Sequence, residues 1–312
     1  MPTNATRRLA AVDIGSNTVH ALVADLEDGL LQEVGHYVEM PELGARVDQT
    51  GRIGPEGTAL VLEALDSVLG QARGPGFEYL VAGATAAVRR APDGAELLSM
   101  ASSLVGVPVH LISEEREAQL AFAGVASAHQ VAGEWVMADL GGGSTEVVAA
   151  RGDRIVTWAS LPIGSGGLAA RHLSDPPHPG EREALRQAAR EAFAGAPVSA
   201  ATRLVVTGGT ATNLPLVVSG DDPPARLGLT ELARAQAVLD GASAAELASE
   251  HEIPAGRVRA LRGGVEVLRL LLRHYGTPAF DISYEGLRHG MILAYARGGD
   301  AWPELEPLTA PE

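Results

Sequence analysis

The sequence predicts an α/β protein built from two similar domains, and a repeated motif carries that prediction. An apolar run, an aspartate, a glycine, small polar residues and a second apolar run occur at residues 9–23 and again at residues 136–150. Each copy is followed by a short polar turn and further apolar residues, a pattern typical of three antiparallel strands joined by tight turns. The aspartates of the two copies, Asp13 and Asp139, are 126 residues apart, which is about one domain length.

In the first half, alternating helices and strands follow the three-stranded meander. Pro55 opens a helix whose apolar residues repeat at helical spacing, and the sequence Gly-Pro-Gly at 74–76 ends it. Ser113 is a good N-cap, and the acids just behind it suit the positive end of a helix. The elements expected in order are a helix over 55–73, a strand over 79–83, a helix over 94–104, a strand over 107–112 and a helix from 113.

The second half repeats this order. Its meander ends near residue 161, and a helical stretch interrupted by prolines follows. A short apolar strand then delivers the sequence Thr-Gly-Gly-Thr at residues 207–210. The elements expected after it are a helix behind that loop, helices over 230–239 and 242–249, a long helix over 258–275, a strand over 279–283 and a helix over 284–297. We therefore expect domains at 1–127 and 128–312, with an acidic tail at 298–312 that is loosely ordered or packed back on the first domain.

The composition excludes several classes of function. The chain has no cysteine, which rules out thiol catalysis and cysteine-ligated metal sites. All 24 basic residues are arginine, so neither a P-loop lysine nor a kinase strand lysine is present. A net charge of −15 argues against a broad nucleic-acid surface. No apolar run approaches the roughly 20 residues that span a membrane, and no signal peptide is recognisable. We expect a cytoplasmic protein that binds neither nucleic acid nor membrane.

The second glycine-rich turn has the chemistry of an anion and cation site. Three successive glycines, Gly141, Gly142 and Gly143, leave backbone N–H groups open to an anion. Asp139 and Glu146 flank them with carboxylates that can hold a hard cation. A single turn of this kind is usually a plain hairpin, but two matched copies, each led by aspartate, favour a functional interpretation.

Six motifs in order resemble those of the exopolyphosphatase/guanosine pentaphosphate phosphohydrolase (Ppx/GppA) family. They cover almost the whole chain and lie at 13–18, 84–89, 112–118, 139–146, 207–210 and 286–290. The resemblance implies two actin-like (ribonuclease H-like) domains of the sugar kinase–hsc70–actin superfamily, with a cleft between them. It also implies Mg²⁺-dependent (or Mn²⁺-dependent) release of terminal phosphate from inorganic polyphosphate or from pppGpp. A homodimer is the expected assembly.

The resemblance also implies roles for individual residues. Glu117 matches the proposed catalytic base, and Asp139 and Glu146 match metal-site positions that also serve catalysis, with Asp13 as a third candidate ligand. Phosphate contacts are expected from side chains, an arginine fork and backbone N–H groups. The expected phosphate-binding residues are Ser16, Asn17, Arg89, Gly141, Gly142, Gly143, Ser144, Thr145, Gly208, Gly209 and Thr210.

Three features depart from the family pattern. Glu42 stands where many members have a basic residue, Arg116 interrupts an acidic run before Glu117, and the chain lacks the C-terminal helical domain of the long members. With the net charge, Glu42 and the missing domain favour short polyphosphate chains, although Arg46, Arg257 and Arg262 could line a groove for longer ones. Two alternatives stay open, namely a pppGpp 5′-phosphohydrolase and a catalytically weak polyphosphate or alarmone sensor. A kinase of the same superfamily would need an adenosine pocket that we cannot place.

Overall fold

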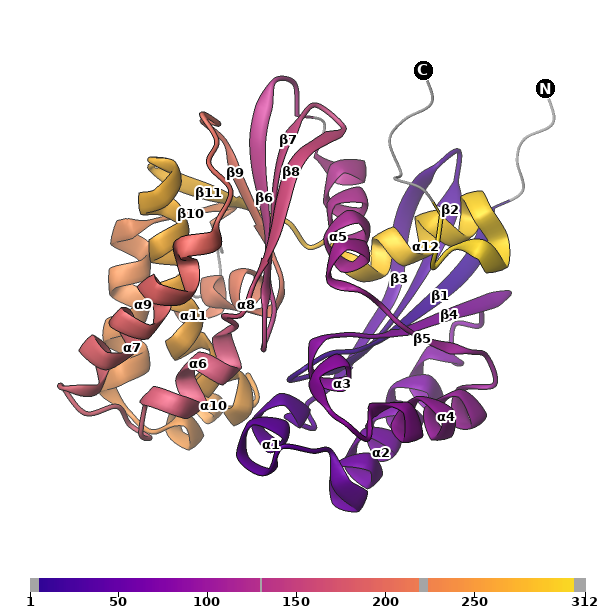
Figure 1. The fold of residues 1–312 in the computed structure, drawn as a ribbon, viewed down its shortest axis with the longest axis horizontal. Coiled ribbons are helices and arrows are strands. Elements are labelled where there is room, and N and C mark those ends of the chain that lie inside the picture. The colour runs from indigo at the N-terminus through magenta and orange to yellow at the C-terminus, as the bar shows by residue number, and fades with distance from the viewer. Residues whose placement is uncertain (1–5, 130, 219–223, 306–312) are drawn as a thin grey trace. The chain divides into compact units, whose positions relative to one another are not determined.

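The computed structural model describes residues 6–129, 131–218 and 224–305. The chain divides into two compact units, the first made of Met1–Ala128 with Glu285–Glu312, and the second of His129–Tyr284. Each unit contains one mixed sheet with helices packed against it (Figure 1). Within the described residues, no helix is both long and apolar enough to cross a membrane.

The first unit is built on a five-stranded sheet in the order β3-β2-β1-β4-β5. The first three strands pair antiparallel as the predicted meander, whereas β4 and β5 run parallel to β1. Alternate residues of β1 face opposite sides of the sheet, so its apolar side chains pack in two separate cores, one on each face. The strands are β1 (Arg7–Ile14), β2 (Val19–Glu27), β3 (Leu30–Glu39), β4 (Tyr79–Ala84) and β5 (Val109–Leu111).

Helices cover both faces of this sheet. On one face, Val12 and Ile14 pack with α2 and α4, and on the other, Leu9 and Ala11 pack with α5 and α12. The contact between α5 and α12 is close, because a Cβ on Gly290 would overlap the carbonyl of Leu120. The helices of this unit are α1 (Leu43–Thr50), α2 (Gly54–Ala72), α3 (Ala86–Arg90), α4 (Gly94–Val105), α5 (Glu114–Ala128), α12 (Leu287–Gly298) and the 3₁₀ turn η2 (Gly299–Ala301).

The second unit contains a six-stranded sheet in the order β10-β11-β9-β6-β7-β8. Its meander is β6 (Glu134–Leu140), β7 (Thr145–Arg151) and β8 (Arg154–Leu161), and its other strands are β9 (Leu204–Thr207), β10 (Arg226–Gly228) and β11 (Ala279–Ile282). One face of the sheet forms a core with the long helix α11 and its neighbours. The helices are α6 (Ser165–His172), α7 (Glu181–Ala192), η1 (Phe193–Gly195), α8 (Gly209–Val218), α9 (Leu229–Gly241), α10 (Ala244–His251) and α11 (Ala255–Tyr275).

The strand register places the two motif aspartates at equivalent positions. Asp13 on β1 lies opposite His20 on β2 and beside Gly83 on β4. Asp139 on β6 lies opposite Glu146 on β7 and beside Thr207 on β9. Each aspartate thus stands near the carboxyl end of a strand paired antiparallel on one side and parallel on the other. This equivalence confirms the predicted α/β fold with a duplicated meander.

The structure differs from the sequence expectations mainly at the C-terminal end. The sequence placed residues 128–312 together, but α12 packs on β1 and α5 of the first unit. The expected tail is described only as far as Leu305, and residues 306–312 lie outside the described part. Three short elements, α1, α3 and β10, were not predicted, because eight, five and three residues give too little apolar periodicity.

His289, in the first turn of α12, is expected to make the stability of the protein depend on pH. Its ring is buried, and burial, reinforced by the neighbouring Arg288, lowers the pKa from 6.5 to about 4 despite the opposing effect of Glu285. Between pH 6.5 and pH 4, the His289 ring is therefore mostly protonated in the unfolded chain but mostly neutral in the folded chain. We expect the free energy of unfolding to fall by about 1 kcal/mol per pH unit across this window.

Urea unfolding at pH 7, 6 and 5 measures this dependence. The variant His289→Gln is expected to show a shallower slope than the parent chain, because the titrating group is gone. Equal slopes in the two proteins would show that His289 does not carry the effect.

Candidate functional site

The carboxyl ends of the first unit's strands bring Arg89 and Glu117 together. Strand β4 leads into α3, which carries Arg89, and β5 leads into α5, which carries Glu117 in its first turn. An Nη1 of Arg89 donates to Oε2 of Glu117 at 2.8 Å and to the carbonyl of Ile112 at 2.6 Å. Both side chains are largely buried, with 16% and 9% of their surfaces exposed. The arginine expected to bind phosphate and the glutamate expected to be the base thus form one charge-assisted pair.

The first glycine turn is held in shape by the segment that begins α1. Within the turn, Gly15 donates to the carbonyl of Thr18 at 2.9 Å. The carbonyls of Ser16 and Asn17 accept from the N–H groups of Gly44 at 2.6 Å and Glu42 at 3.1 Å. The close approach of Gly44 to Ser16 leaves little room for a side chain there. Ser16 and Asn17 are buried, and α1 is the support that sequence reasoning missed.

Asp13 faces an arginine of the C-terminal helix. Its Oδ2 lies 3.5 Å from Nη1 of Arg288, and both side chains are mostly buried. The pair joins two residues separated by 275 positions (288 − 13), so neither could be assigned to the other from local pattern. A guanidinium at this distance competes with a metal ion for the carboxylate, which makes Asp13 a weaker candidate ligand than Asp139 or Glu146.

In the second unit, Asp139 and Glu146 are neighbours across two strands. They form a directly opposed pair between β6 and β7, so their side chains lie on the same face of the sheet. The Oε1 of Glu146 accepts a hydrogen bond from Ser160 Oγ at 2.9 Å, and Glu146 is 1% exposed. Asp139 is more accessible, and its Oδ1 lies against Gly208, where a Cβ would stand 3.0 Å away.

The second glycine turn is fixed by the start of α6. The carbonyl of Gly141 accepts from the Ser165 N–H at 2.9 Å, and that of Gly142 accepts from the Gly167 N–H at 2.9 Å. In a trans peptide, the N–H points opposite to the carbonyl of the same unit. The N–H groups of Gly142 and Gly143 therefore point away from α6, as an anion-binding turn requires.

Gly164, just before α6, lets that helix approach the turn. A Cβ on Gly164 would overlap the backbone of Gly142 and Gly143, which cannot rotate away as a side chain can. We expect Gly164→Ala to displace the turn and to lower the free energy of unfolding by about 1–3 kcal/mol, as overpacking does. Urea unfolding measures this change. Gly180→Ala is the matched control because no atom lies near its added Cβ, and equal stabilities of the two variants would contradict the prediction.

The loop from β9 into α8 is a second candidate phosphate loop within the second unit. Gly208 has φ 94°, a backbone conformation that suits glycine. Gly209 is the first residue of α8, whose amino end carries the positive end of the helix dipole. The guanidinium of Arg257 packs so tightly on Gly209 that a Cβ there would collide with it. Arg257 is the only one of the three proposed groove arginines that the structure places at a candidate phosphate loop.

Several expected residues are engaged in the interior. The Thr145 hydroxyl donates to the Ile163 carbonyl at 2.5 Å, which ties the turn to the segment just before α6. Thr210 is 1% exposed and packs on Gly264 of α11. Arg262 is also 1% exposed and donates to the carbonyls of Leu239 and Ala242. The expectation that Arg262 could line a groove is therefore wrong. The side chains of Thr145 and Thr210 are used in the interior, while the backbones of these two residues remain in the two glycine-rich loops.

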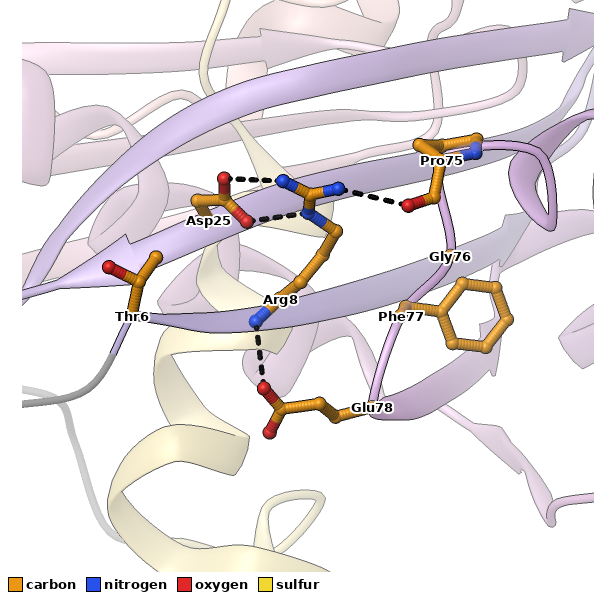
Figure 2. A pocket seen from close by; sticks show the side chains of 7 residues that line it. All are labelled: Thr6, Arg8, Asp25, Pro75, Gly76, Phe77 and Glu78. Carbon is orange, nitrogen blue, oxygen red and sulfur yellow. Dashed lines mark hydrogen bonds and ion pairs between the residues drawn. The ribbon is translucent and has the colours of Figure 1, made fainter.

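Other polar clusters are less suited to phosphate. At the amino end of β1, Figure 2 shows a surface depression in which Arg8 donates to both carboxylate oxygens of Asp25 and to the Pro75 carbonyl, so its guanidinium is already matched. Arg46 similarly donates to the Ile53 carbonyl and to Glu56. Across residues 6–129, 131–218 and 224–305, no cluster of three or more histidine, cysteine or acidic residues could hold a metal ion by itself.

Comparisons with known proteins agree with this arrangement. The chain is 30% identical over 311 residues to an uncharacterized protein of Streptomyces coelicolor, covering 95% of this chain and 92% of that one. It is 29% identical to Exopolyphosphatase 2 of Mycobacterium tuberculosis, covering 94% and 99% of the two chains. A match to Exopolyphosphatase 1 of the same organism is 34% identical but covers 56% of this chain and 51% of the relative.

Solved structures and the family model point the same way. The Ppx/GppA enzyme of Aquifex aeolicus superimposes with a TM-score of 0.73 at 26% identity, over 93% of this chain and 99% of that one. An exopolyphosphatase-like protein gives a TM-score of 0.84 at 25% identity, covering 94% and 98%. The model of the Ppx/GppA phosphatase family matches residues 22–297. These matches, together with the duplicated meanders, show that the chain belongs to the Ppx/GppA phosphatase family.

Proposed function

We propose that the protein is an Mg²⁺-dependent exopolyphosphatase that releases terminal orthophosphate from inorganic polyphosphate, with a preference for short chains. The observation that carries the proposal is the buried 2.8 Å pair between Arg89 and Glu117 at the carboxyl ends of β4 and β5. The pair combines a guanidinium, which can bind phosphate oxygens, with a carboxylate, which can act as a general base.

In the proposed mechanism, a phosphate chain draws Arg89 away from Glu117. The guanidinium then holds phosphate oxygens, and the released carboxylate orients an attacking water and accepts its proton. As the water oxygen bonds to the terminal phosphorus, the bond from that phosphorus to the bridging oxygen breaks, and the shortened chain leaves as an anion. Backbone N–H groups of the turn at Gly142 and Gly143, together with the amino end of α8, stabilise negative charge on the transferred phosphoryl group.

The carboxylates of the second unit fit Mg²⁺. This ion usually takes one or two protein carboxylates and fills its remaining positions with water and phosphate oxygens. Asp139 and Glu146 supply such a pair from one face of the sheet. Bound there, Mg²⁺ would neutralise charge on the substrate oxygens.

The charges near the candidate site support the preference for short chains. Arg89 forms an ion pair with Glu117, and Arg288 forms one with Asp13. Neither pair adds net positive charge. Arg262 lies in the interior, and the whole chain carries a net charge of −15. Each phosphate outside the metal site therefore meets repulsion from the net negative charge.

One assay tests the proposal. Orthophosphate release is measured from short polyphosphate, long polyphosphate and pppGpp at fixed free Mg²⁺. We expect the highest kcat/KM, per chain, for short polyphosphate. A value that rises steadily with chain length would contradict the length preference, and a higher value for pppGpp would favour the alarmone phosphatase. The expected homodimer stays a prediction that sedimentation velocity would check.

A further inference from the structure

Arg116 precedes the expected base, and its side chain reaches the C-terminal end of the described chain. Its Nη2 donates to the Trp302 carbonyl and its Nη1 to the Leu305 carbonyl, both at 2.6 Å. Arg116 is 7% exposed, and such a buried guanidinium costs much desolvation unless its donors are used. The two contacts lie 186 and 189 residues away in sequence, so they fix a distant segment to the first turn of α5.

The segment at residues 299–305, here called the C-terminal clasp, is folded onto the first unit. Its 3₁₀ turn ends in the Trp302 N–H donating to the Gly299 carbonyl at 3.0 Å. Trp302 is 3% exposed and belongs to the core that contains Ile112 and Leu120. Asp300 accepts from the Tyr79 hydroxyl at 2.7 Å, so the clasp is attached at several points.

The clasp contacts the same elements that position Glu117. The indole of Trp302 meets the ring of His110 on β5 edge-on, with centroids 5.5 Å apart. The carbonyl of Ile112, two residues later, accepts the hydrogen bond from Arg89, and the Ile112 side chain packs in the core that contains Trp302. Leu120, on α5, belongs to the same core. One side of the first turn of α5 is therefore held by Arg89 and another by the clasp.

We propose that the C-terminal clasp is a positioning device for catalysis and that Arg116 is its anchor. Resting on the proposed function, this assigns Arg116 the role of holding the first turn of α5 where Glu117 can pair with Arg89 and reach the attacking water. Adjacent helical residues point about 100° apart, so Arg116 can hold the helix from behind without entering the substrate site. The acidic-to-basic departure at this position is thereby explained by a contact within this chain.

The proposal predicts a defect in turnover rather than in binding. In Arg116→Met the anchoring donors are lost while the apolar stem remains. We expect kcat to fall about 10- to 100-fold, because small misplacement of a catalytic group has effects of that size, whereas KM changes less than about threefold. Arg116→Lys should recover part of the loss, since it keeps a donor but not the fork.

Two controls separate positioning from general loss of stability. Arg182→Met removes an equally buried arginine that binds Asp240 and the Arg262 carbonyl in the second unit. It should lower Tm but leave kcat nearly unchanged. Trp302→Ala weakens the clasp itself, and in the double variant with Arg116→Met the loss of kcat should not exceed that of the worse single variant, because both act through one contact.

Hydrogen exchange of the intact chain tests the clasp independently of activity. In Arg116→Met, the amides of residues 116–120 should exchange at least about tenfold faster than in the parent chain, while those of α11 stay protected. Unchanged exchange at 116–120 would overturn the proposal, as would an equal loss of kcat in Arg182→Met. Faster exchange in a chain that hydrolyses no polyphosphate would instead support the clasp and contradict the proposed function.

Discussion

Replacing Glu117 with glutamine is expected to lower kcat for polyphosphate by about 10²–10⁴-fold, the usual contribution of a general base. The change keeps the shape of the side chain but removes its charge and its capacity to accept a proton. Glutamine can still accept a hydrogen bond from Arg89, now at 2.8 Å from the carboxylate, so α5 should keep its place. Because Arg89 loses a competing negative charge, KM should stay the same or fall.

Steady-state kinetics at saturating Mg²⁺ measure this effect. Glu115→Gln is the matched control, since Glu115 is an exposed acid in the same turn, with its Oε1 3.4 Å from Gln119 Nε2. It should leave kcat within about twofold of the parent value. A Glu117→Gln enzyme that also works within a few-fold of the parent would exclude Glu117 as the base.

The second large effect is expected from Asp139→Asn. The substitution preserves volume beside Gly208, but an amide oxygen is a much weaker ligand for Mg²⁺ than a carboxylate. We expect kcat/KM at fixed free Mg²⁺ to fall by about 100-fold and the Mg²⁺ activation curve to shift to higher concentration. Titration with Mn²⁺, followed by electron paramagnetic resonance or by calorimetry, measures metal affinity without requiring turnover.

Asp153→Asn provides the comparison for Asp139. Asp153 is an exposed aspartate in the β7–β8 turn, outside the candidate site. Its replacement should leave both the metal titration and kcat/KM unchanged. If the Mg²⁺ activation curve of Asp139→Asn superimposes on that of the parent chain, Asp139 is not a metal-site residue.

Local patterns were sufficient to predict most of the elements that carry candidate residues, but not the short helices α1 and α3. Apolar runs interrupted by aspartate and glycine identified both meanders, and the register then placed Asp13 and Asp139 at equivalent positions. The first-turn acids predicted the start of α5, which begins at Glu114. These features depend on residues close in sequence, where side-chain periodicity and turn chemistry decide the structure.

Long-range contacts could not be predicted in this way. The Asp13–Arg288 pair, the packing of α12 on the first unit and the reach of Arg116 to Trp302 all join distant parts of the chain. An arginine also looks the same in sequence whether it lines a groove or, like Arg262, satisfies buried carbonyls. Which role it takes depends on tertiary packing, which a local pattern does not contain.

The most direct test of the central proposal is orthophosphate release from short-chain polyphosphate by the purified protein, with and without Mg²⁺, compared with Glu117→Gln. We predict release that requires Mg²⁺, proceeds from chain ends and is lost in the variant while Mn²⁺ binding and folding are retained. Absence of release from polyphosphate by the folded parent chain in the presence of Mg²⁺, or equal release by parent and variant, would contradict the assignment.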